Sequence, residues 1–156
     1  YWGHCPVTEH RGTLGAVDIV QQAIIDTDSD LAALDTPERV SLRLKFSHDT
    51  GIAPRLAFLK VNGMGAEIND PAEIKNYFQD YKVAMGSNFQ FIFYRSKRNP
   101  EILFRVLYNG DEASLPLPEV AKGFYRWNDF KAYYGPLVEE GQKKLKEIEE
   151  KQQRKP

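Results

Sequence analysis

The chain has 156 residues, of which 42% are hydrophobic and 28% charged, and its formal net charge is −1. This length suits one domain with its own core, and the near-neutral charge gives no sign of the broad basic face that nucleic-acid binding usually needs. The apolar runs are too short to span a membrane, and the single cysteine excludes an internal disulfide or a zinc site made of several cysteines.

The first third of the chain predicts a helix, a loop and a strand. Residues 13–28 carry apolar side chains at spacings of three and four, which is typical of an amphipathic helix. Residues 28–39 are polar, contain a proline and predict a loop. Residues 40–47 alternate between apolar and polar side chains, which predicts a strand. On its polar side, Arg43 and Lys45 are expected to face solvent or to pair with acidic residues, and the alternative is that they line a cleft.

The middle of the chain predicts two further helices and three strands. A helix is expected over Gly51–Val61, and a short capped helix over residues 70–78. The alternating residues 88–95 and 101–109 flank a five-residue turn, which predicts a β-hairpin whose aromatic side chains form core rather than a base-stacking surface. A short third strand is expected over residues 112–117.

The C-terminal part predicts one long helix from about Trp127, with a break or kink near Gly135–Pro136. Residues 137–156 have Glu and Lys at four-residue spacing and only a thin apolar stripe. We therefore expect residues 1–156 to form a single domain whose last part, 137–156, is a solvated helix and tail.

The turn His48-Asp49-Thr50-Gly51 joins the predicted strand to the helix that follows it. The free N–H groups and the positive dipole end of that helix suit a phosphate. A hydrogen-donating His48 adds a charge-assisted contact to a phosphoryl oxygen, and a protonated Asp49 has a proton to give to a departing alkoxide.

Other interpretations of this turn stay open. The pair His48-Asp49 also suits a polar strand end followed by a capping aspartate, with no further function. A metal-dependent phosphohydrolase with His-Asp ligands would need more histidines than His4 and His10, the other two in the chain, so no metal is expected.

The run "LRLKFSHDTGIAPRLAFLKV" (residues 42–61) resembles the C-terminal signature of the histidine acid phosphatases, the branch of the histidine phosphatase superfamily that includes the phytases. The later run "VAMGSNFQFIFYRSKRNPEILFRVLYNGDEASLP" (residues 83–116) is similar to the closing hairpin and short strand of that family. The likeness covers roughly Val40 to Pro118. It implies an α/β fold, with a mixed sheet, flanking helices, a β-hairpin and a C-terminal helix.

The resemblance also implies an activity. In that family the histidine of an "RHGxRxP" motif attacks phosphorus, without metal or cofactor, and forms a phosphohistidine. By analogy, His48 and Thr50 would bind the substrate phosphate, with His48 beside Asp49 in catalysis, and Asp49 would be the general acid. The substrates would be small organic phosphates, with inositol polyphosphates as candidates, although "HDT" departs from the "HAE" expected in the inositol-polyphosphate subgroup. A periplasmic or secreted location is what the resemblance suggests.

The nucleophile motif of the family is missing, because no "RHG" occurs in the chain. The run "EHRGTLG" (Glu9–Gly15) contains the same three residue types in a different order. His10 is therefore expected to be an ordinary loop histidine. We expect the chain to be the C-terminal part of a longer phosphatase, inactive alone, with the N-terminal part of the same phosphatase as its partner. The alternatives are a phosphate-binding or interaction module without catalysis and a structural domain in which His48-Asp49 is coincidental.

Overall fold

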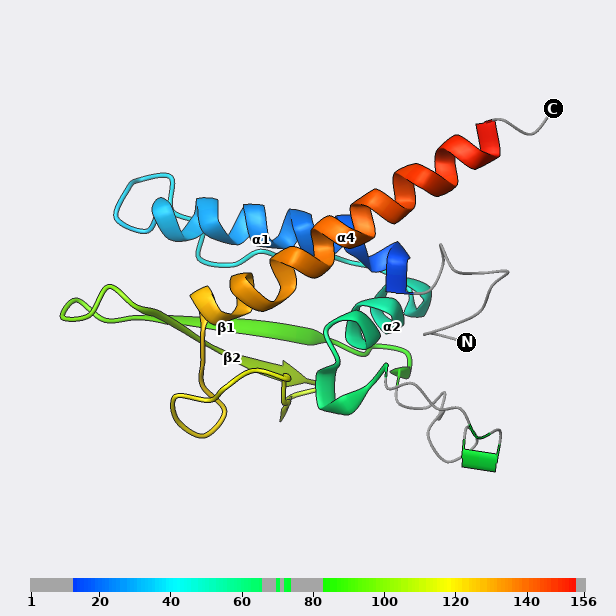
Figure 1. Cartoon of the computed structure of the whole chain (residues 1–156). Coiled ribbons are helices and arrows are strands. Elements are labelled where there is room, and N and C mark those ends of the chain that lie inside the picture. Colours follow the sequence, from blue (N-terminus) through cyan, green and yellow to red (C-terminus); the bar gives the residue numbers. More distant parts are fainter. Residues whose placement is uncertain (1–12, 66–69, 71, 74–82, 154–156) are drawn as a thin grey trace.

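A four-stranded antiparallel sheet with helices on one side forms the body of the chain, and the computed structural model describes residues 13–65, 70, 72–73 and 83–153 (Figure 1). Strands β1 (Phe89–Arg95) and β2 (Ile102–Tyr108) form the predicted hairpin, in which Phe91 lies opposite Val106. The two-residue strands β3 (Asp111–Glu112) and β4 (Tyr125–Arg126) both pair with β2 on its other edge. The hairpin prediction is therefore confirmed, and β2 is the central strand.

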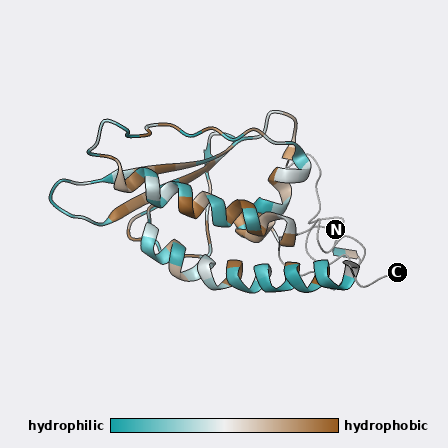
Figure 2. Ribbon diagram, turned by 90° about the horizontal axis from the view of Figure 1, so that it is seen from above, coloured by the Kyte–Doolittle hydropathy of each residue, from teal (hydrophilic) through white to brown (hydrophobic). Residues whose placement is uncertain are grey.

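In the described residues, the helices α1, α2 and α4 accompany the sheet. Helix α1 (Val17–Ala32) follows a 3-10 turn over Thr13–Ala16, and α2 (Asp49–Phe58) is followed by a second short 3-10 turn. Helix α4 (Trp127–Gln153) packs on the sheet and runs beside α1 (Figures 1 and 2). The predicted α/β class, with flanking helices, a hairpin and a C-terminal helix, is confirmed. Every strand pairing that the structure describes is antiparallel, so the parallel part of the expected mixed sheet does not occur among these residues.

The core lies between the hairpin and the start of α4, and it is largely aromatic. Phe104 of β2 is fully buried, and its ring centroid lies 5.6 Å from those of Phe91 and Phe130. Trp127 and Phe130 stack at 4.8 Å, and Phe130 contacts Tyr134 at 4.4 Å. The aromatic strand residues are therefore core, as their alternation predicts.

Helix α4 is continuous through Pro136, so of the predicted break or kink near Gly135–Pro136 the break does not occur. Proline removes one backbone N–H and crowds the preceding turn, which favours a kink in isolation. Here the buried side chains of Tyr134 and Val138, on either side of Pro136, hold both halves of the helix on the same core. Beyond Gly141 the side chains of α4 are mostly exposed, and this last part is hydrophilic in Figure 2.

The strand predicted over residues 40–47 is wrong for the described structure. This segment runs beside α1, but no described strand pairs with it. Its apolar side is left in solvent, with relative exposures of 73% for Leu42, 64% for Leu44 and 93% for Phe46. A strand forms only when a neighbouring strand takes up its backbone hydrogen bonds, and the described residues supply none here.

The polar side of residues 40–47 behaves as predicted. Arg43 donates to Asp30 of α1 at 2.9 and 2.7 Å, and Lys45 donates to Asp26 of α1 at 2.7 Å. These ion pairs hold the segment against α1.

Several predicted boundaries shift. Residues 28–32, predicted as loop, complete α1, and α2 spans Asp49–Phe58 rather than Gly51–Val61. The strand predicted over 112–117 is limited to Asp111–Glu112. The helix predicted over 70–78 lies mostly outside the described residues, as do His4, Cys5 and His10.

Candidate functional site

The His48-Asp49 turn forms the beginning of α2. His48 is the N-cap residue, with extended backbone angles (φ −90°, ψ 171°), and its carbonyl oxygen accepts hydrogen bonds from the N–H groups of Gly51 and Ile52 at 2.9 and 3.0 Å. Its side chain makes no capping hydrogen bond. The imidazole is therefore not used to build the helix.

Asp49 is tied to its own turn. Its Oδ1 accepts a hydrogen bond from the backbone N–H of Thr50 at 2.7 Å. The residues His48, Asp49 and Thr50 are all exposed. The structure thus brings the three residues singled out in the sequence together at one open helix terminus, where a carboxylate, an imidazole and a hydroxyl face solvent.

The opposite end of α2 is fixed in the core. Leu56 and Ala57 are buried, and the hydroxyl of Tyr134 donates to the carbonyl oxygen of Leu59 at 2.6 Å. Burial raises the pKa of Tyr134 well above its usual range, so this hydroxyl keeps its proton and remains a donor. The His-Asp turn is therefore exposed, whereas the rest of the helix that it begins is held in the core.

Two residues of α2 shape its first turn. Pro54 has no N–H, so the carbonyl oxygen of Thr50 lacks its normal helical donor. Gly51 has no Cβ, and an added Cβ would lie 2.1 Å from Oγ of Ser47. A larger residue at position 51 would therefore displace the Ser47 hydroxyl from its place beside the helix start.

Arg55 is the residue that the sequence did not single out. Its Nη2 lies 3.4 Å from Oγ of Ser47, next to the His-Asp turn, and its Nε is buried without a hydrogen-bond partner among the described residues. Its sequence position shows only an arginine inside a helix. The contact with Ser47, and the lack of a partner, depend on how the chain enters α2.

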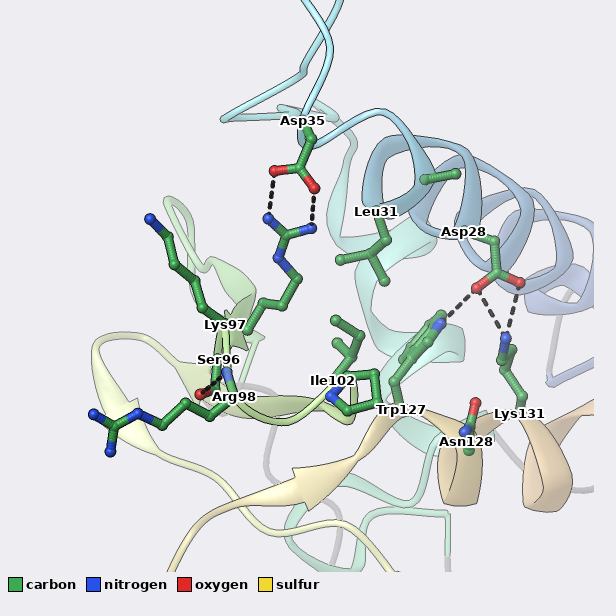
Figure 3. Close-up of a pocket in the computed structure, with 13 residues that line it drawn as sticks. Asp28, Leu31, Asp35, Ser96, Lys97, Arg98, Ile102, Trp127, Asn128 and Lys131 are labelled. Atoms are coloured by element: carbon green, nitrogen blue, oxygen red, sulfur yellow. Dashed lines mark hydrogen bonds and ion pairs between the residues drawn. The ribbon is translucent and has the colours of Figure 1, made fainter.

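A cavity of 760 Å³ lies at the other end of the molecule, between the end of α1, the hairpin and the start of α4 (Figures 1 and 3). Its acidic groups are already paired: Asp35 accepts two hydrogen bonds from Arg95, and Asp28 accepts from Lys131 and from Nε1 of Trp127. Lys97 and Arg98, on the hairpin turn, point away from it (Figure 3). The cavity does not include the His-Asp turn and has no set of convergent unpaired groups.

The described residues contain neither a metal-binding cluster nor a membrane-spanning helix. Across residues 13–65, 70, 72–73 and 83–153, no three His, Cys, Asp or Glu side chains are grouped to hold a metal ion. None of the helices described there is both long and apolar enough to cross a membrane.

Comparison with known protein families shows to which family the chain belongs. The model of the histidine phosphatase superfamily (branch 2) matches residues 6–109, which is more than half of the chain and includes the His-Asp turn and the hairpin. The chain therefore belongs to branch 2 of the histidine phosphatase superfamily, and phosphatase-type chemistry is the general activity of its class. No curated protein matches the chain.

Proposed function

We propose that the chain supplies the general acid and a phosphate ligand for phosphomonoester hydrolysis, in an enzyme of the acid phosphatase and phytase type. Family membership supports a phosphatase. The observation that carries the proposal is the exposed His48-Asp49 pair at the N-terminus of α2, inside the matched residues. A helix N-terminus favours bound anions, and the pair adds a hydrogen-bond donor and a carboxyl group.

The roles follow from the chemistry of phosphoryl transfer. A nucleophilic histidine forms a bond to phosphorus while the bond to the ester oxygen breaks, and Asp49 gives its proton to that departing oxygen. His48 and Thr50 hold phosphate oxygens during this step. Water then attacks the phosphohistidine, Asp49 takes a proton from that water, and phosphate and the free histidine are released.

The nucleophile lies outside this sequence, which has no "RHG" motif. In our proposal the N-terminal part of the same phosphatase supplies it and covers the apolar side of residues 40–47. The high exposure of Leu42, Leu44 and Phe46 supports such a partner, because apolar side chains in a row normally mark a contact surface. The chain alone is then expected to be inactive.

The substrates in this proposal are small organic phosphates, inositol polyphosphates among them, and the reaction uses neither metal nor cofactor. A periplasmic or secreted location belongs to the same proposal and rests only on the phosphatase type. His48 is followed by Asp-Thr rather than Ala-Glu, which favours the acid phosphatase and phytase type over the inositol-polyphosphate subgroup.

The test is the leaving-group dependence of Asp49→Asn in the phosphatase assembled with its nucleophile. Hydrolysis of an alkyl phosphate should slow about 10²–10⁴-fold, because its alkoxide needs the proton. Hydrolysis of 4-nitrophenyl phosphate should slow much less, since its phenolate leaves without one. Asp111→Asn, at an exposed aspartate of β3, should change neither rate. Equal slowing of both substrates by Asp49→Asn would contradict the general-acid role.

A second candidate is a phosphate-binding module without catalysis, which the missing nucleophile motif favours. In such a module, Asp49→Asn should leave phosphate affinity unchanged or improve it, because the substitution removes a negative charge from the site. The substitution therefore separates the two functions when turnover and phosphate binding are both measured.

A further inference from the structure

Arg55 reaches back along α2 toward the His-Asp turn. Side chains on a helix lean toward its N-terminus, and Arg55 is one turn after Gly51. Its Nη2 lies 3.4 Å from Oγ of Ser47 and would lie 3.4 Å from a Cβ at Gly51. The guanidinium therefore lies beside the first turn of α2, near Ser47, which precedes the His-Asp pair, and near Gly51, which comes after it.

The charge of Arg55 is not neutralised by any carboxylate in the described part of the chain. Two other described arginines without a carboxylate partner, Arg39 and Arg98, are exposed to water, whereas Arg55 is partly buried and its Nε is completely buried. The remaining described arginines each pair with at least one carboxylate: Arg43 with Asp30 and Asp26, Arg95 with Asp35, Arg105 with Glu112, and Arg126 with Glu101 and Asp129. Arg55 thus combines burial with an unpaired charge.

This position is electrostatically unfavourable without an anion. Burial removes water from the guanidinium and lowers the pKa of Arg55. The N-terminus of α2 adds its own partial positive charge to the same place. An anion bound at the turn would offset both effects, because it would pair with the guanidinium and lie at the positive end of the helix.

We propose that Arg55 is a third phosphate ligand of this site, acting together with His48 and Thr50. The inference rests on the proposed function, since it names a further group for the same phosphate. A guanidinium is planar and binds two phosphate oxygens in parallel, which an imidazole does not do. Arg55 thereby fixes the orientation of the phosphoryl group relative to Asp49, as a binding residue that transfers no proton.

The test is titration of the full chain with inorganic phosphate, followed by ³¹P NMR and calorimetry. Wild type should bind saturably, and Arg55→Gln should weaken the affinity at least about tenfold, the loss expected for one charge-assisted pair. Arg55→Lys should recover part of the affinity, because it restores the charge but not the paired donors. The matched control, Arg98→Gln, removes an exposed arginine far from the turn and should stay within about twofold of wild type.

The outcomes separate this inference from the proposed function. If His48→Gln weakens phosphate binding and Arg55→Gln does not, the role of Arg55 is wrong and the phosphate site stands. If wild type shows no saturable binding, the phosphate site itself is wrong, and the role of Arg55 fails with it. Circular dichroism and the urea midpoint without phosphate check that each variant is folded. The rise in that midpoint on adding phosphate should be smaller in Arg55→Gln than in wild type.

Discussion

Arg43 donates hydrogen bonds to both carboxylate oxygens of Asp30 and thereby attaches residues 40–47 to helix α1. Lys45 makes a similar contact with Asp26. Leu42, Leu44 and Phe46 alternate in sequence with Arg43 and Lys45 and are exposed, so holding the two basic side chains against α1 leaves the apolar ones facing outward. The exposed row of Leu42, Leu44 and Phe46 is a consequence of these ion pairs.

The ion pairs predict a pH-dependent attachment of this segment. The hydrogen bonds from Arg43 lower the pKa of Asp30 below the usual 3.8, because they favour the charged carboxylate. A lowered folded pKa means that the stabilisation is fully present above pH 3.8 and is lost as the pH falls through the lowered value. In an NMR titration of the carboxyl groups, Asp30 should therefore titrate below 3.8.

Arg43→Gln should return the midpoint of Asp30 toward 3.8. Limited proteolysis at pH 7 gives a second measurement. Trypsin should cleave after Lys45 several-fold faster in this variant, because residues 40–47 have lost their main contact with α1. An unchanged Asp30 midpoint in Arg43→Gln would show that the pair is absent in solution.

Two glycines of α4 predict different responses to the same substitution. A Cβ at Gly141 would lie 2.5 Å from Cγ2 of Val17, which is fully buried on α1. Gly141→Ala should therefore lower the free energy of unfolding by about 1–3 kcal/mol, since overpacking outweighs the gain in helix propensity. A urea unfolding curve measures this change.

Gly135→Ala is the matched control in the same helix. No heavy atom lies within 4 Å of a Cβ placed there. The gain in helix propensity is partly offset by the restriction that Pro136 imposes on the residue before it, so the change should stay within about 0.5 kcal/mol. Equal destabilisation by both substitutions would contradict the close packing of α4 on α1.

Local patterns predicted those parts of the fold whose partners are close in sequence. The hairpin was predicted within one residue at each end, because its two strands alternate and are joined by a short turn. Helix α1 was found from its apolar spacing. Its C-terminal end lies beyond the predicted one because residues 28–30 are polar, and two of them, Asp28 and Asp30, make contacts with distant residues.

The features that were missed depend on contacts between distant parts of the chain. Alternation over residues 40–47 predicts a strand, but pairing needs a second strand that local patterns cannot supply. The place of His48-Asp49 at a helix start follows from sequence to within two residues. That Arg55 lies beside this turn without a carboxylate partner in the described residues is a tertiary property, which local patterns do not reveal.

A comparison of two phenylalanines tests the division between core and exposed surface. Phe104 is fully buried among aromatic rings, whereas Phe46 is 93% exposed. Phe104→Ala should lower the free energy of unfolding by about 3–5 kcal/mol, because it removes buried surface and leaves a cavity. Phe46→Ala should change it by less than about 0.5 kcal/mol, since its ring is already in water.

Urea unfolding of dilute protein measures both changes. If Phe104→Ala does not fold, Phe104→Leu replaces it and should show a smaller loss of unfolding free energy. Sedimentation at the same concentration confirms that each sample is monomeric. If Phe46→Ala destabilises the monomer as much as Phe104→Ala does, residues 40–47 are covered by the chain itself in solution. The proposed partner would then have no exposed apolar row to bind.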